Sequence, residues 1–161
     1  MSDIDPTTLT PTQLAPMLRA WAGGLYPSEA AVELLIAHGR WLRRRDFLAC
    51  LVDAVDDGWG SRGEVVLMAS IDWERVETFL GQAGVSSSEA GVLRFAASLA
   101  GVPGGPSVLE MTAGLDDVNA GLVLEALAHR CGWHEHGAIK TVTGTFAEAP
   151  ASATSWLDVR A

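Results

Sequence analysis

Apolar residues recur at three- and four-residue spacing along most of the chain, which is the period of an amphipathic α-helix. Several of these stretches start with a residue pair whose side chains can satisfy the free backbone amides of a helix start. The clearest pairs are Thr10 with Gln13 and Ser86 with Glu89, and Asp116 is a good single cap before the last apolar stretch. The sequence therefore predicts three well-defined helices, which end near Gly23, Gly101 and Gly132.

Weaker signals predict further helices between these three. One helix is expected over about 28–39, and another over about 72–81, where Asp72 can act as the cap. Ser107 and Glu110 form another capping pair, which predicts one short helical turn.

Two segments near the middle of the chain are harder to interpret. A helix is predicted over 40–55, because its large apolar side chains would share one face. The segment 65–71 fits a capped helix that begins near Ser61, but its β-branched run also fits a short buried strand. We interpret 65–71 as helix.

These patterns together predict an all-α, mainly helical fold: a compact bundle of about six or seven short helices with at most a minor two-stranded β element. The segment 139–143 has strand character, and the residues after it are mostly Ala, Pro, Ser and Thr. We expect a single helical domain over 1–137 and an extended C-terminal tail over 138–161. The predicted core consists of Trp41, Leu48, Leu51, Trp73, Val76, Phe79, Phe95, Leu99, Leu122 and Leu127.

Composition narrows the possible functions. The chain has 161 residues, of which 48% are hydrophobic, so it can bury a core of its own as a monomer or small homo-oligomer. The net charge of -9 argues against nucleic acids and anionic membranes as partners. There are two cysteines, no signal-peptide pattern at the N-terminus, and no apolar run long enough to span a bilayer, so a cytoplasmic protein with free thiols is expected.

A run of arginines at 40–45 stands out in this acidic chain. If the segment is helical, Arg40, Arg43 and Arg44 project from one face, with Trp41 beside them. Such a patch can bind phosphate, RNA or an acidic surface of a protein partner, and Trp41 could stack on a ligand. Charge runs are more commonly solvated or neutralised by neighbouring acidic residues.

The segment 129–136 carries most of the residues that could ligate a metal. Its candidates for zinc are His129, Cys131, His134 and His136. Structural zinc sites draw their ligands from two separated segments, and no second ligand pair is present elsewhere in the chain. Histidines that interact with the carbonyl end of a helix are the alternative interpretation.

The segment Ala83-Gly84-Val85-Ser86 resembles the turn of helix-turn-helix DNA-binding domains, within a hairpin over 72–100. That resemblance implies a reading helix with Ser87, Ser88 and Arg94 as DNA contacts. The chain departs from the pattern at Leu80, where the motif has a small residue, and Arg94 is the only basic residue of the second helix. A plain helical hairpin explains the same residues.

No catalytic motif is found in a context that supports it. The segment 58–63 matches G-x-G-x-x-G, but it is expected to follow a helix, whereas a dinucleotide-binding fingerprint follows a strand and opens a helix. We therefore expect a small helical interaction or regulatory accessory protein that binds an unidentified protein partner, without catalysis and without a cofactor. A helix-turn-helix-like DNA-binding regulator and a metal-binding protein that uses 131–136 are the alternatives.

Overall fold

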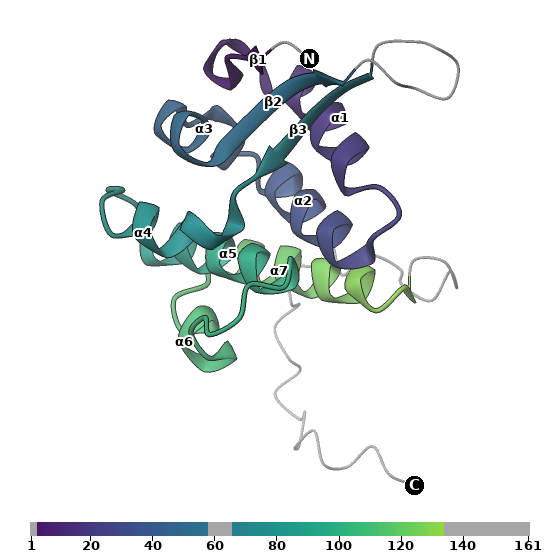
Figure 1. Cartoon of the computed structure of the whole chain (residues 1–161). Helices are drawn as coiled ribbons and strands as arrows, with labels where there is room; N and C mark the ends of the chain where they lie inside the picture. Colours follow the sequence, from purple (N-terminus) through teal and green to yellow (C-terminus); the bar gives the residue numbers. More distant parts are fainter. Residues whose placement is uncertain (1–2, 58–65, 134–161) are drawn as a thin grey trace, which may run out of the picture.

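The computed structural model of the chain describes residues 3–57 and 66–133 (Figure 1). These residues form a mainly helical fold with a small antiparallel sheet, which confirms the predicted fold class. The strands are β1 (Asp3–Ile4), β2 (Val52–Asp57) and β3 (Val66–Ile71), and short 3₁₀ turns cover Pro6–Thr8, Trp41–Arg43 and Trp73–Arg75. The seven α-helices in this part of the chain are α1 (Pro11–Ala22), α2 (Tyr26–His38), α3 (Arg45–Leu51), α4 (Val76–Leu80), α5 (Ser87–Leu99), α6 (Val108–Thr112) and α7 (Asp117–Arg130).

The predicted capping pairs start their helices as expected. At α1 the Thr10 hydroxyl accepts a hydrogen bond from the Gln13 amide, and the Gln13 side chain accepts one from the Thr10 amide. The same reciprocal pattern starts α5 and α6. Each pair satisfies two backbone amides that would otherwise lack partners at the helix start, so the start is fixed by local sequence.

Helix α2 lies at the centre of the molecule and contacts α1, α5 and α7 (Figure 1). Helix α1 in turn packs against β3, so the sheet, α1, α2 and the α5–α7 pair follow one another in layers. A helix that is covered on several sides needs apolar residues around most of its circumference. Helix α2 meets this need with the buried side chains of Ala30, Ala31, Val32, Leu34 and Leu35.

Three aromatic side chains pack against one another in the core. The ring of Trp41 lies 5.5 Å from that of Phe47 and 6.1 Å from that of Phe79, measured between centroids, and Phe47 and Phe79 are 6.0 Å apart. Their tilted and edge-on arrangements are those that aromatic pairs prefer. The Trp41 side chain is only 1% exposed, so it is a structural residue.

The predicted helix over 40–55 is wrong. This stretch forms a single 3₁₀ turn and the short helix α3, and the chain then enters strand β2 at Val52. Strand β2 is the middle strand of the sheet, because it pairs antiparallel with β1 on one edge and with β3 on the other. The pairing satisfies its backbone on both sides, which overrides the helical spacing of its apolar residues.

Our interpretation of 65–71 as helix is also wrong, because residues 66–71 form β3. The sheet has three strands instead of at most two, and all three come from before residue 72. The strand-like segment 139–143 and the expected tail over 138–161 lie outside the described residues. Among residues 3–57 and 66–133, no helix has the length and apolar character needed to cross a bilayer.

Most of the predicted core residues are buried, and one is not. Trp73 and Leu122 are half-buried at the edge of the core, whereas Leu127 is 38% exposed. Its placement in the core is therefore wrong. Helix α7 buries Asn119, Val123 and Ala126, and Leu127 lies at the edge of this buried face, where it is open to solvent.

Candidate binding cleft between helices α2, α5 and α7

The predicted arginine face on one helix does not exist. Arg40 precedes the 3₁₀ turn, Arg43 ends it, and Arg44 lies between the turn and α3. Each arginine has its own contact: the Arg43 Nε donates to the Gly39 carbonyl at 3.1 Å, and Arg44 donates to the carboxylate of Asp46. The prediction was wrong because the chain leaves the helix after α2, and the helical spacing then no longer applies.

Trp41 is not available for stacking on a ligand at the surface. Its ring is buried among aromatic residues, and the guanidinium carbon of Arg44 lies 5.6 Å from the ring centre. This cation–π contact uses one face of the indole within the protein itself. Arg44 and Trp41 therefore form part of the packing around the start of α3.

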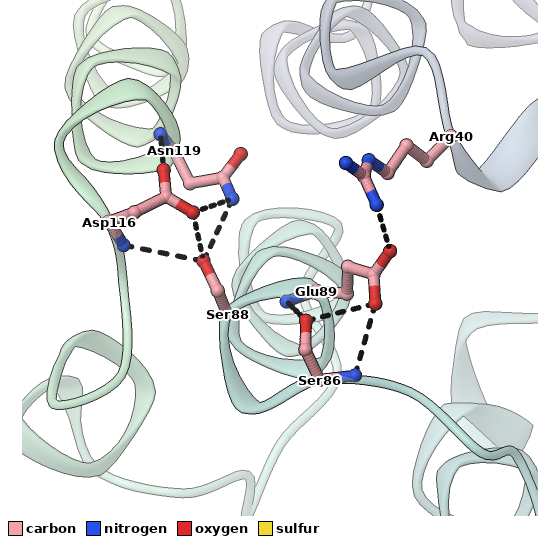
Figure 2. Close-up of polar contacts among 6 residues, drawn as sticks. All are labelled: Arg40, Ser86, Ser88, Glu89, Asp116 and Asn119. Carbon is pink, nitrogen blue, oxygen red and sulfur yellow. Dashed lines mark hydrogen bonds and ion pairs between the residues drawn. The ribbon is translucent and has the colours of Figure 1, made fainter.

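Arg40 is the arginine that reaches another part of the molecule. Its side chain is 72% exposed, and its Nη1 donates a hydrogen bond to Oε1 of Glu89 at 2.9 Å (Figure 2). Glu89 also closes the capping pair of α5, because its Oε2 accepts from the Ser86 amide at 3.0 Å. One carboxylate thus ties residue 40 to the start of a helix that follows it by almost fifty residues.

A cleft with a volume of about 440 Å³ opens beside this ion pair. It lies where the end of α2 meets the starts of α5 and α7, so its walls come from three separate segments of the chain. The lining residues are Ala37 and His38 from α2, then Arg40, then Ser86, Ser88 and Glu89 from the start of α5, and Asp116, Val118, Asn119 and Leu122 from the start of α7.

A second polar network connects the starts of α5 and α7 (Figure 2). The Ser88 hydroxyl donates to Oδ2 of Asp116 at 2.9 Å and accepts from the Asn119 side-chain amide at 2.8 Å. Asp116 caps α7, because its Oδ1 accepts from the Asn119 backbone amide at 2.9 Å. These bonds hold the two helix starts at a fixed separation and so fix one wall of the cleft.

Asn119 is the one polar residue that is buried in the described part of the chain, with 8% of its surface exposed. Its side chain belongs to this network. Its side-chain nitrogen donates to both Ser88 and Asp116, so both amide hydrogens are in use. No described residue donates a hydrogen bond to its Oδ1, and Figure 2 shows this oxygen pointing away from Asp116, toward the side where Arg40 lies. The oxygen is an acceptor on the wall of the cleft.

The charges in the cleft are set by these hydrogen bonds. The Asn119 backbone amide, with the Ser88 hydroxyl, lowers the pKa of Asp116, and the Ser86 amide and hydroxyl lower that of Glu89. Burial lowers the pKa of His38, so its imidazole is neutral at neutral pH. One positive charge, on Arg40, then faces two negative charges, on Glu89 and Asp116, which leaves a net charge of -1.

A second hollow of about 310 Å³ continues the cleft along α2 and α7. The two hollows adjoin at Ala37 and Leu122, which line both, and we call the pair of hollows together the α2–α7 groove. The added part has Glu33 and Glu125 on its sides, and Glu33 is paired with Arg19. The remaining residues of this part are Leu34, Ala126 and His129.

The zinc candidates are only partly within the described residues. His129 lies at the end of α7, with its Nε2 3.3 Å from Oε2 of Glu29, and Cys131 is exposed just beyond the helix. His134 and His136 lie outside the described residues. Within residues 3–57 and 66–133, no group of three or more His, Cys, Asp or Glu side chains is arranged to hold a metal. Zinc binding by the four residues together stays a prediction.

The DNA-contact candidates lie on a helix that is mostly buried. Helix α5 contacts α2, α4, α6 and α7, and eight of its 13 residues are buried. Ser88 is held in the network with Asp116, and Arg94 makes two hydrogen bonds to Glu77, of 2.8 and 3.0 Å, while Ser87 is exposed. A reading helix must insert an open face into the major groove, so this arrangement argues against the DNA-binding alternative.

The glycine-rich segment 58–63 lies outside the described residues. Our expectation that it follows a helix was wrong, since the element before it is β2. The next described element after it is β3, which is also a strand. A dinucleotide-binding fingerprint leads from a strand into a helix, so the flanking elements do not support one here.

Sequence reasoning identified Arg40, but it missed His38 and Asn119 and assigned Asp116 only a capping role. Asn119 carried a usable signal, because it is a polar residue in line with the buried Val123 and Ala126 on α7.

The sequence matches no protein-family model, and the comparisons with curated proteins and with solved structures return no significant match.

Proposed function

We propose that this is a non-catalytic interaction protein, and that its protein partner docks along the α2–α7 groove with Arg40 at one end of the contact. The observation that carries the proposal is that two hollows adjoin at Ala37 and Leu122 and follow each other along α2 and α7. The hollow between α2 and α7 is lined mainly by apolar residues with charged residues beside them, and the hollow at the Arg40 end is mainly polar; grooves that bind a segment of another protein combine such apolar and polar parts.

The size of the groove suits a peptide segment. It follows α7 from Asp116 to His129, and at 1.5 Å per residue this stretch is about 20 Å long. A helix of a few turns or a short extended segment spans that length. At the Arg40 end, Val118 is 75% exposed and offers an apolar contact beside the charged residues.

The polar network supports binding over chemistry. Two hydroxyls in the cleft wall donate to carboxylates, that of Ser86 to Glu89 and that of Ser88 to Asp116. The Ser86 oxygen accepts the Glu89 amide as the cap of α5, and the Ser88 oxygen already accepts hydrogen bonds from the Asn119 side chain and the Asp116 amide. Both lone pairs of the Ser88 oxygen are thus engaged, whereas a nucleophile needs one free. The lowered pKa of Asp116 also makes that carboxylate a weak general base.

A site-specific photocrosslinking experiment tests the proposal. The full chain is expressed in its source cells with p-benzoylphenylalanine in place of Val118, in the groove, or in place of Leu109 on α6, which is 77% exposed and outside the groove. We expect a discrete adduct with another protein at position 118 and none at 109.

A charge reversal in the groove supplies the second comparison. Glu125→Arg, on the side of the groove, should remove the adduct at position 118, whereas Glu74→Arg, on the exposed 3₁₀ turn before α4, should leave it unchanged. Equal adducts at positions 118 and 109, or an adduct that persists in Glu125→Arg, would contradict docking along the groove.

A further inference from the structure

At the corner of the cleft formed by Asn119 and Asp116, across the cleft from Arg40 and His38, the unused hydrogen-bonding atoms are acceptors. Asn119 is more than nine-tenths buried, both hydrogens of its side-chain amide are in use, and its Oδ1 accepts nothing from the described residues. Asp116 stands next to it with two carboxylate oxygens, of which Oδ1 accepts a single bond in this network. A group that fills this corner must donate hydrogen bonds.

The charge of the cleft favours a cation, although its most visible residue is an arginine. Arg40 is neutralised by Glu89, and Asp116 has no basic partner in the described part of the chain. The groove continues past Glu125, which adds a further carboxylate, while Glu33 is already paired with Arg19. The net side-chain charge along the groove is therefore negative, which favours a positive group over a negative one, and the carboxylates of Glu89 and Asp116 offset the partial positive charges at the starts of α5 and α7.

We propose that the cleft binds the primary ammonium group of a lysine side chain, with Asn119 Oδ1 and the Asp116 carboxylate as its acceptors. This inference rests on the proposed function, since the lysine belongs to the docked protein partner. An ammonium group has three donors and no acceptor, which matches the unused atoms of this corner. The aliphatic stem of the lysine lies along Val118 and Leu122, where its carbon atoms are removed from water.

The ligand group proposed here is positively charged, whereas the arginine run predicted a negatively charged partner surface. An acidic partner would need Arg40, Arg43 and Arg44 to act together, but each of them makes its own separate contact. Arg40 instead forms the far wall of the cleft and holds Glu89 in place. Its removal would leave Glu89 unpaired and make the cleft more negative.

An NMR titration of the full chain tests the lysine site directly. The probe is Nα-acetyl-lysine methylamide, and the matched control is the same molecule acetylated on its Nε. We expect saturable shifts of the Asn119 side-chain amide and the Val118 backbone amide with the lysine probe. The acetylated probe should bind at least about tenfold more weakly, the effect of losing a hydrogen bond between charged groups.

Two variants separate the lysine site from an acidic partner. Asp116→Asn keeps a good helix cap and should weaken binding of the lysine probe by about tenfold, because it removes the charge. Arg40→Gln should strengthen binding of the same probe. Loss of lysine binding in Arg40→Gln, or shifts of the same amides with Nα-acetyl-glutamate methylamide and not with lysine, would overturn the proposal.

The photocrosslink at position 118 and the lysine titration can have different outcomes, which distinguishes a failure of the lysine site from a failure of protein docking. If the photocrosslink at position 118 forms but the lysine and acetylated probes bind equally, the partner docks in the groove and the lysine assignment is wrong. If the crosslink fails while the lysine probe binds selectively, the cleft recognises an ammonium group and the docking of a protein along the groove is wrong.

Discussion

Helices α5 and α7 begin in similar ways and are packed very differently. They have 13 and 14 residues, each has a capping side chain before its first turn, and together they form the polar wall of the cleft. Among residues 3–57 and 66–133, helix α5 contacts four other helices, whereas the substantial contacts of α7 are with α2 and α5 only. Eight residues of α5 are buried, against three of α7.

The difference in packing between the two helices explains how the cleft can have a rigid wall and still be open to solvent. Helix α5 has small residues at buried positions, which let neighbouring helices approach its backbone closely. Helix α7 presents Leu124 and Leu127 to solvent. The framework of the cleft therefore comes from α5, and the surface that a partner can reach comes mainly from α7.

The largest expected change in stability comes from shortening a core side chain in α5, which tests the difference in packing between α5 and α7. Leu93 is fully buried, so Leu93→Ala should lower the free energy of unfolding by about 2–5 kcal/mol through lost burial and a residual cavity. The same change at Leu127, which is 38% exposed, should cost less than about 1 kcal/mol. Urea unfolding followed by circular dichroism gives both values, and similar costs for the two variants would show that α7 is packed as tightly as α5.

A smaller effect is expected where α6 touches α5. A Cβ atom at Gly91 would lie 2.7 Å from the carbonyl oxygen of Met111 and 3.2 Å from Cδ2 of Leu115. Gly91→Ala should therefore destabilise the protein by about 1–3 kcal/mol, even though alanine favours helix.

The matched control for Gly91 is Gly84, in the turn before α5, where no atom lies within 4 Å of the Cβ position. Gly84→Ala should leave the thermal midpoint almost unchanged. A stabilised Gly91→Ala variant would mean that α6 can move away from α5 without cost.

The smallest expected effect concerns the ion pair at the start of α5. The folded-state pKa of Glu89 lies below its ordinary value of 4.5, because the Ser86 amide and hydroxyl and Arg40 favour the carboxylate. Because the folded-state pKa is the lower one, this stabilisation is fully present above the unfolded-state pKa and is lost as the pH falls through the folded-state pKa. Glu89→Gln should cost about 1 kcal/mol at pH 7 and much less at pH 3.

The measurement for Glu89 is the urea midpoint of wild type and variant at the two pH values. Glu74→Gln, on the exposed turn before α4, is the control and should change the midpoint little at either pH. An unchanged difference between wild type and Glu89→Gln at pH 7 and pH 3 would contradict the assigned role of this carboxylate.

The parts of the fold that could be predicted from sequence are those fixed by local hydrogen bonds. Ser86 with Glu89 satisfies helix amides within four residues, so α5 was predicted with its start. Strand β2 depends on partners that are far away, since Ile4 and Ile71 flank it on opposite edges. Helical spacing within 40–55 carries no information about those partners, and the helix prediction failed there.

The candidate cleft could be predicted only in part, for the same reason. Arg40 was singled out because it belongs to an unusual run, but its pairing with Glu89 arises when the end of α2 meets the start of α5. Asn119 contributes the decisive oxygen because α7 turns it inward against Ser88. No local pattern specifies either contact, since both depend on how the helices pack.

The central position of α2 has a consequence for how the molecule unfolds. This helix is shared between the sheet side, through α1, and the helical side, through α5 and α7. Opening either side alone would leave the apolar residues of α2, such as Leu35, facing water on that side. We therefore expect neither side to be stable alone, and we expect the described part of the chain to unfold as one cooperative unit in which the cleft persists as long as the sheet does.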